Sequence, residues 1–392
     1  MTERTLRGRV AIAGIGQTPY YRHGQSPHPE ARLTLDAILN ACADAGIDPR
    51  TIDGFSSYSN DRNDGPRLAA ALGCRELRYS NRVWGGGGGG TAAAIQNAAA
   101  AIAVGLADCV VAYRGLAQGQ FGRFGRGAEV PAVAGEPAHT VPYGMMSAAQ
   151  MFAAKAMRFM HEHGVERSAL RAIAMASYHH AQNNPAAIMH GRPLTAEQYD
   201  ASRWIVEPFR LYDCCQENDG AAAVILVAAE RAKDLPHKPC YLLGAASGGP
   251  YRAAAPVHNT PDYGSAHFGP VAERLYAMAR IGPADVDVVQ AYENFTGGVL
   301  MALVEHGFCR PAEANEFFTV ENLLAPDGRL PLNTSGGNLA ECYMHGLGLV
   351  IEAIRQIRGT SPNPVAADVS LMIAGPMVTP VSACVFGSEA TL

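Results

Sequence analysis

Six consecutive glycines occupy residues 85–90, between a mixed stretch at 78–84 and an alanine-rich run at 91–104. This pattern predicts a turn from a strand into a helix, where the amides of the first helical turn point outward and can bind an anion. Glycine lets the backbone approach a ligand closely, but it carries no reactive atom. The run is followed neither by the acidic residue of a dinucleotide fingerprint nor by the Lys-Ser/Thr of a P-loop. We therefore expect a turn that offers amides and space, with a plain flexible loop as the alternative.

The composition indicates a globular protein that is too long for one small core. The chain has 392 residues, 48% of them hydrophobic, and a formal net charge of −5. Two domains or two fused halves are expected at this length, and the acidic balance argues against a nucleic-acid binder. No charge-free apolar run reaches the ~18 residues that suggest a transmembrane helix. Residues 1–10 lack the apolar core and cleavage site of a signal peptide.

The cysteines and histidines point to reduced thiols and to no metal centre. The nine cysteines are scattered and odd in number, which is typical of a cytoplasmic protein rather than of a disulfide framework. His161 with His163, and His179 with His180, have no further ligands at a recognisable spacing. We therefore expect surface helix histidines rather than a metal site.

Strand patterns alternate with helix patterns in two similar sets, which predicts an α/β protein. The first set is strand 9–15, helices 33–45 and 92–104, strand 109–113, helices 151–163 and 167–183, and strand 221–228. The second set is strand 240–246, helix 270–279, strand 286–291, helices 298–306 and 347–358, and strands 369–373 and 381–386. Such alternation predicts a largely parallel sheet covered on both faces. The similar sets suggest a duplication, with one half at 1–232, including a loop region at about 115–205, and the other at 233–392.

Three polar segments interrupt the apolar pattern. Residues 213–223 form a polar turn that leads into a buried strand, and on its own this segment is most simply a turn. Residues 292–295, Tyr-Glu-Asn-Phe, follow predicted strand 286–291, at the end of a parallel strand where α/β sheets bind ligands. Residues 333–346 form a glycine-rich loop that carries Tyr343 and His345 before a helix.

In these segments the chain resembles the thiolase superfamily, and most of all its sterol-carrier and lipid-transfer branch. The resemblance covers nearly the whole chain through residues 10–18, 158–164, 208–223, 281–309 and 333–348. No single segment is decisive, but their order and spacing are specific. The resemblance implies two similar βαβαβαββ halves in five-layer α/β/α/β/α packing, a homodimer and an acyl-CoA substrate.

The resemblance also locates the family's catalytic positions, and the chain departs from the family at each of them. The nucleophilic cysteine of a thiolase falls in the glycine run, at Gly88 or within a residue or two of it. The Asn or His that precedes an acidic-then-Phe stretch becomes Tyr292, and the histidine after a Gly-Gly pair becomes Tyr343. The second cysteine becomes Ala374, followed by Gly375. Glycine and alanine cannot carry an acyl group, which thiolysis requires of a thiolate.

Retro-aldol cleavage of a β-hydroxyacyl-CoA fits a site without a nucleophile. It requires stabilisation of a thioester enolate and groups that move protons. One tyrosine, Tyr292 or Tyr343, would take the β-hydroxyl proton and the other would protonate the enolate carbon. His345 would polarise Tyr343 or brace the loop. Gly88 and Gly375 are expected beside the substrate, where the glycine run would leave room for a bulky polycyclic group.

The chain resembles the steroid side-chain aldolases of this branch. These release propionyl-CoA and a ring ketone, need no cofactor beyond the CoA of the substrate, and work with a small OB-fold partner. Two alternatives stay open. A thiolase could use a displaced cysteine such as Cys342 or Cys384, and a degenerate thiolase could serve as a lipid-binding scaffold without catalysis.

Overall fold

The computed structural model describes residues 5–121, 133–253, 260 and 262–392, so part of the loop region expected at about 115–205 lies outside the described residues. Its main sheet runs in the order β10-β11-β12-β9-β1-β8-β5-β3-β4, and β2 also pairs with β8. The strands of this sheet are β1 (Val10–Gln17), β2 (Tyr21–Arg22), β3 (Gly54–Tyr58), β4 (Tyr79–Val83), β5 (Cys109–Ala117), β8 (Asn218–Ala228), β9 (Cys240–Gly248), β10 (Val288–Ala291), β11 (Val369–Ala374) and β12 (Val381–Gly387). A separate hairpin joins β6 (Trp204–Val206) to β7 (Phe209–Arg210).

The strand order is symmetric about the contact between β1 and β9. On one side β8, β5, β3 and β4 follow β1, and on the other side β12, β11 and β10 follow β9. An isolated parallel bridge between Val289 and Leu332 lies beyond β10, in the place that β4 takes on the first side. This symmetry agrees with the two similar sets of the sequence. The boundary between residues 232 and 233 stays a prediction.

The predicted largely parallel sheet is wrong for the centre of the fold. Only the outer pairs β3–β4, β3–β5 and β10–β11 are parallel, whereas β5–β8, β8–β1, β1–β9, β9–β12 and β12–β11 are antiparallel. The start of β8 pairs with the end of β5, since Asp219 lies opposite Ala117. The long connection between these strands therefore returns to the edge that it left, which reverses the strand direction. Alternation of strands and helices along the chain does not reveal such a return.

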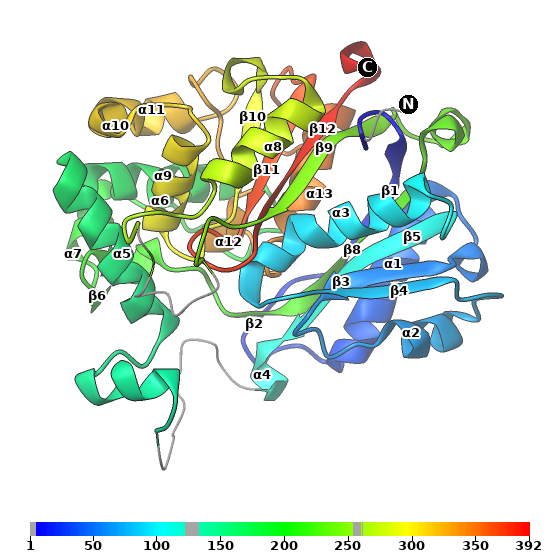
Figure 1. Cartoon of the computed structure of the whole chain (residues 1–392), viewed down its shortest axis with the longest axis horizontal. Coiled ribbons are helices and arrows are strands. Elements are labelled where there is room, and N and C mark those ends of the chain that lie inside the picture. Colours follow the sequence, from blue (N-terminus) through cyan, green and yellow to red (C-terminus); the bar gives the residue numbers. More distant parts are fainter. Residues whose placement is uncertain (1–4, 122–132, 254–259, 261) are drawn as a thin grey trace.

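The helices cover both outer faces of the sheet and fill the space between its halves (Figure 1). The helices are α1 (Glu30–Ala45), α2 (Gly65–Leu72), α3 (Gly90–Ala103), α4 (Gln118–Phe121), α5 (Ala148–His163), α6 (Arg167–Ala181), α7 (Ala196–Ala201), α8 (Gly269–Ala279), α9 (Thr296–Glu305), α10 (Ala314–Phe317), α11 (Val320–Leu323), α12 (Gly337–Ala340) and α13 (Leu347–Arg358). Helices α3 and α13 contact each other and strands of both halves, while α1 lies on β1, β5 and β8, and α8 on β9 and β12. The α/β class and the five layers expected from the resemblance are confirmed.

The glycine run is the turn that the sequence predicted. It lies between β4 and α3, and its middle, Gly87–Gly89, forms a short 3₁₀ turn. Gly85 and Gly87 adopt positive φ values of 77° and 70°, which only glycine adopts readily. The neighbouring strands β3 and β4 were missed, because serines in both strands, with Asn81 and Arg82 in β4, hide the apolar pattern. No helix in the described part of the chain is long and apolar enough to cross a membrane.

Candidate active site

The two predicted tyrosines meet between the halves of the fold. Tyr292 directly follows β10, and Tyr343 lies in the turn between α12 and α13. Their hydroxyl oxygens are 2.8 Å apart, and the rings meet edge to face at 6.1 Å between centroids. Both side chains are buried, with exposed fractions of 2% and 7%. The structure thus joins two phenols that are 51 residues apart in the chain.

Backbone hydrogen bonds fix both tyrosines in place. The side-chain amide of Asn333 accepts from the Ala291 amide at 2.7 Å and donates to the Ala291 carbonyl at 2.9 Å, which ties the 333–346 loop to the end of β10. The amide of Tyr292 donates to the carbonyl of Ile373 in β11. The amide of Tyr343 donates to Asn218 Oδ1, at the start of β8, at 3.0 Å. Each phenol is therefore anchored to a different strand.

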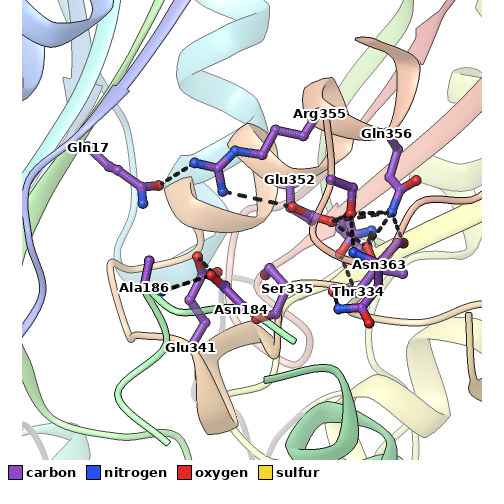
Figure 2. A network of polar contacts seen from close by, with 12 residues as sticks. Gln17, Asn184, Ala186, Thr334, Ser335, Glu341, Glu352, Arg355, Gln356 and Asn363 are labelled. Atoms are coloured by element: carbon purple, nitrogen blue, oxygen red, sulfur yellow. Dashed lines mark hydrogen bonds and ion pairs between the residues drawn. The ribbon is translucent and has the colours of Figure 1, made fainter. Parts of the chain in front are cut away.

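A polar network behind the site supports the same loop (Figure 2). Glu352 Oε1 accepts from the Thr334 hydroxyl at 2.6 Å, and Gln356 donates to Thr334 Oγ1 at 2.8 Å. Asn363 donates to the Thr334 carbonyl at 2.7 Å. On the neighbouring segment, Asn184 donates to the Ser335 carbonyl at 2.9 Å. Buried networks of this kind rigidify a loop when their polar groups are paired.

His345 lies among the aromatic rings of the site. Its ring stacks on Tyr58 at 5.2 Å with an interplanar angle of 10°, and its centroid is 5.6 Å from that of Tyr343 and 6.3 Å from that of Tyr292. Its carbonyl oxygen lies 3.1 Å from the Tyr58 hydroxyl and 2.7 Å from Thr91 Oγ1. These contacts hold the backbone of the loop against β3 and α3. They agree with the bracing role, and polarisation of Tyr343 by His345 stays a prediction.

The ring of Tyr292 occupies the space beside Gly88. A Cβ atom at position 88 would lie 2.3 Å from Cζ and 2.7 Å from the hydroxyl of Tyr292. Gly346 abuts the same ring, since a Cβ there would lie 2.5 Å from Tyr292 Cδ2. Room for a polycyclic group beside the glycine run stays a prediction. In this structure the missing side chain makes room for the phenol.

Gly375 also contacts the glycine run rather than open space. Its φ is +71°, and a Cβ there would lie 2.2 Å from the amide nitrogen of Gly89. Ser382 donates its hydroxyl to the Gly89 carbonyl at 2.7 Å. Ala374, at the position of the second thiolase cysteine, is fully buried. Gly375, the residue after Ala374, thus lies against the glycine run, and neither position 88 nor position 374 carries a thiol.

Burial sets the protonation of the site. It raises the pKa of Tyr292 well above its ordinary value, and the neighbouring Tyr343 raises it further. Burial also raises the pKa of Tyr343, and burial lowers the pKa of His345 well below its ordinary value. Near neutral pH the site therefore holds two neutral phenols and a neutral imidazole. One tyrosine is expected to take the β-hydroxyl proton, and burial disfavours the phenolate form of both tyrosines.

The cysteines near the site are buried thiols. Burial raises the pKa of Cys342 well above its ordinary value, with a further rise from Glu341, and it raises that of Cys384, whose Sγ lies 3.4 Å from the Ala92 carbonyl. A third thiol, Cys215, lies near both tyrosines, and burial raises its pKa as well. Sequence reasoning missed Cys215 although it lies in the 213–223 segment. A nucleophilic cysteine requires the opposite shift.

Sequence reasoning also missed a buried ion pair next to the rings. Arg114 in β5 is 1% exposed, and its Nη1 lies 3.1 Å from Asp61 Oδ2. The guanidinium carbon lies 5.1 Å from the centroid of the Tyr58 ring. A single arginine inside an otherwise apolar strand is a signal that could have indicated it, because a buried charge requires a partner. As for metals, the described residues contain no group of three or more His, Cys, Asp and Glu side chains arranged to hold an ion.

Comparisons with known proteins show which family the chain belongs to. Residues 252–385 match the family described as "Thiolase C-terminal domain-like". The chain is 38% identical to the 17-hydroxy-3-oxo-4-pregnene-20-carboxyl-CoA lyase of Mycobacterium tuberculosis, with 97% of this chain and 100% of the relative covered. It is also 38% identical to the steroid side-chain-cleaving aldolase of Thermomonospora curvata, with 98% and 99% covered.

Solved structures show the same relationship. The structure named "Ltp2-ChsH2(DUF35) aldolase" superposes with a TM-score of 0.90 at 38% identity and covers 98% of this chain and 99% of that chain. A monomeric SCP2-thiolase-like protein from Mycobacterium smegmatis has a TM-score of 0.72 at 18% identity, with 97% and 78% covered, and shares the fold. The chain therefore belongs to the steroid side-chain-cleaving aldolases of the thiolase superfamily.

Proposed function

We propose that this protein catalyses retro-aldol cleavage of a steroid β-hydroxyacyl-CoA thioester and releases propionyl-CoA and a ring ketone. The observation that carries the proposal is the 2.8 Å contact between the hydroxyls of Tyr292 and Tyr343, at two positions where a thiolase holds catalytic residues. The two thiolase cysteines are replaced by Gly88 and Ala374. The relatives that cover the whole chain are named as a lyase and an aldolase.

The paired phenols support a relay of protons between neutral groups. The β-hydroxyl gives its proton to the oxygen of one phenol as the carbon–carbon bond breaks. That phenol passes its own proton to the second phenol, whose proton goes to the α-carbon that received the bonding electrons. One proton has then moved from oxygen to carbon, so the reaction needs no oxidant, no free CoA and no further cofactor. The relay also avoids a free phenolate, which burial disfavours at both residues.

The site supports neither the thiolase with a displaced cysteine nor the scaffold without catalysis. A thiolase with a displaced cysteine needs a thiolate, and burial raises the pKa of Cys215, Cys342 and Cys384. A scaffold without catalysis would not require two phenols in hydrogen-bond contact, because a buried hydroxyl that lacks a partner costs about 1–3 kcal/mol and apolar residues would pack there more simply.

The site is closed in the isolated chain, and we propose that a partner subunit completes it. Both phenols are almost fully buried. One solved relative is named for a second component, ChsH2(DUF35), beside Ltp2. An OB-fold partner on a homodimer of this chain would fit that arrangement. A cytoplasmic location is part of the same proposal, and all nine cysteines are free thiols.

The test is incubation of the chain and its partner with a steroid β-hydroxyacyl-CoA in the absence of free CoA. An aldolase releases the ketone and propionyl-CoA in equal amounts. A thiolase requires free CoA, and a scaffold releases neither product. Cleavage that begins only after CoA is added would reject the proposal.

A further inference from the structure

One buried charge beside the tyrosines has no role in the relay. Arg114 comes from β5 and Asp61 from the turn after β3, and their side chains are 1% and 0% exposed. Parallel strands β3 and β5 end at the same edge of the sheet, the edge at which α/β folds bind ligands. A buried ion pair is weak evidence for stability, because desolvation offsets most of the Coulomb energy. Its presence here requires another explanation.

The two members of this ion pair differ in the hydrogen bonds that they form. Asp61 accepts from the Asn63 amide at 2.7 Å, from the Asn63 side chain at 3.0 Å and from the Gly115 amide at 3.3 Å. Nε and Nη1 of Arg114 form no hydrogen bond of good geometry within the described part of the chain. The Asp61 carboxylate therefore accepts hydrogen bonds from its surroundings, whereas two nitrogens of the Arg114 guanidinium donate none to the described residues and its positive charge is less fully balanced.

The positive end of the pair faces the tyrosines. The guanidinium carbon lies 5.1 Å from the centroid of Tyr58, whose ring also stacks on His345 at 5.2 Å. Burial raises the pKa of Tyr343 and lowers that of His345, and in both residues the nearby Arg114 cation lowers the pKa. Burial also raises the pKa of Tyr58, on which both members of the ion pair act, since Arg114 lowers it and Asp61 raises it, with Arg114 the larger of the two.

We propose that Arg114 is an electrostatic positioning residue: through the Tyr58–His345 stack it holds positive charge toward the tyrosine pair and stabilises the thioester enolate that forms there. The inference rests on the proposed aldolase function. In the relay negative charge builds on the α-carbon and the thioester oxygen as the carbon–carbon bond breaks and the protons move together. A fixed cation in a buried site stabilises that charge without reorganisation. Tyr58, which belongs to no sequence motif, lies between the Arg114 guanidinium and the His345 ring.

The test removes the charge without leaving a lone carboxylate. Arg114→Gln alone would bury an unpaired Asp61 and endanger folding, so the informative variant is Arg114→Gln with Asp61→Asn. It should keep a thermal midpoint close to that of the wild type, while kcat for steroid β-hydroxyacyl-CoA cleavage falls roughly 10–10²-fold and KM changes little. Arg114→Lys keeps the charge and should recover part of kcat. Arg82→Gln, which removes a half-exposed arginine 3.8 Å from Asp64, is the matched control and should cleave at the wild-type rate.

Combining the double variant with Tyr343→Phe separates an electrostatic role from a structural one. If Arg114 acts through the phenol pair, its removal costs much less once the pair is broken, whereas a structural defect costs the same in both backgrounds. Wild-type kcat in the folded Arg114→Gln/Asp61→Asn protein, or equal losses in the two backgrounds, would overturn the inference. Absence of cleavage by the wild type with its partner would instead reject the proposed function.

Discussion

A single methyl group at position 88 should disable this site. In Gly88→Ala the new Cβ would lie 2.3 Å from Cζ and 2.5 Å from Cε2 of Tyr292, whereas ordinary contact begins near 3.4 Å. The ring must therefore move by about 1 Å. It is 2% exposed, and Gly346 abuts it elsewhere, so no free space receives it.

The magnitude follows from that displacement. Overpacking a buried position costs about 1–3 kcal/mol, which should lower the thermal midpoint by a few degrees without preventing folding. A shift of about 1 Å also breaks or compresses the 2.8 Å contact between the two hydroxyls. Misplacement of reacting groups by this amount costs about 10²-fold in rate. We expect kcat to fall by about that factor.

Gly86→Ala is the matched control. It introduces the same methyl group two residues earlier in the same run, where a Cβ meets nothing within 4 Å and the backbone is extended. The assay is cleavage of a steroid β-hydroxyacyl-CoA with the partner present, together with the thermal midpoint of each variant. Wild-type kcat in Gly88→Ala, or an equal loss in Gly86→Ala, would refute the assignment of this space to Tyr292.

Three further predictions concern the phenols, one buried carboxyl and the thiols. Tyr292→Phe and Tyr343→Phe should each lower kcat by ~10²–10⁴-fold, and the double variant should lose less than the product because the two groups act together; near-normal rates in both single variants would favour the scaffold. Burial raises the pKa of Glu293 to about 8, so its contribution to stability is full below its ordinary value of 4.5 and is lost as the pH rises through about 8. The thermal midpoint should therefore fall as the pH rises from about 4.5 to about 8, and Glu293→Gln should flatten the fall; identical slopes would refute this. Cys215→Ala and Cys342→Ala should retain cleavage, and mass spectrometry of trapped enzyme should find no acyl adduct on either thiol.

Much of the site could be predicted from the sequence because it lies in motifs with a fixed order. Tyr292 follows a strand and precedes an acidic-then-Phe stretch, and Tyr343 follows a Gly-Gly pair, so both could be assigned to catalytic positions of a known fold. The structure then joins their hydroxyls. Gly88 was located in the same way, but what fills the space beside it depends on the fold of a segment 200 residues away and could not be predicted.

The remaining features depend on contacts that no local pattern encodes. Arg114 and Tyr58 belong to no motif, and they reach the site only because β3 and β5 pair in parallel and end together. The antiparallel centre of the sheet follows from the return path between β5 and β8, which is a tertiary property. The raised pKa values of the phenols follow from complete burial, whereas sequence reasoning could consider only the ordinary value of a phenol, about 10.

The measurement that tests the central claim most directly is cleavage in heavy water, followed by mass analysis of the acyl-CoA product. The claim is that paired phenols, and no cysteine, move one proton from the β-hydroxyl to the α-carbon. The account predicts propionyl-CoA with one deuterium at its α-carbon, formed without free CoA, and loss of this product in Tyr292→Phe/Tyr343→Phe. Unlabelled propionyl-CoA, or formation that depends on free CoA and persists in the double variant, would contradict it.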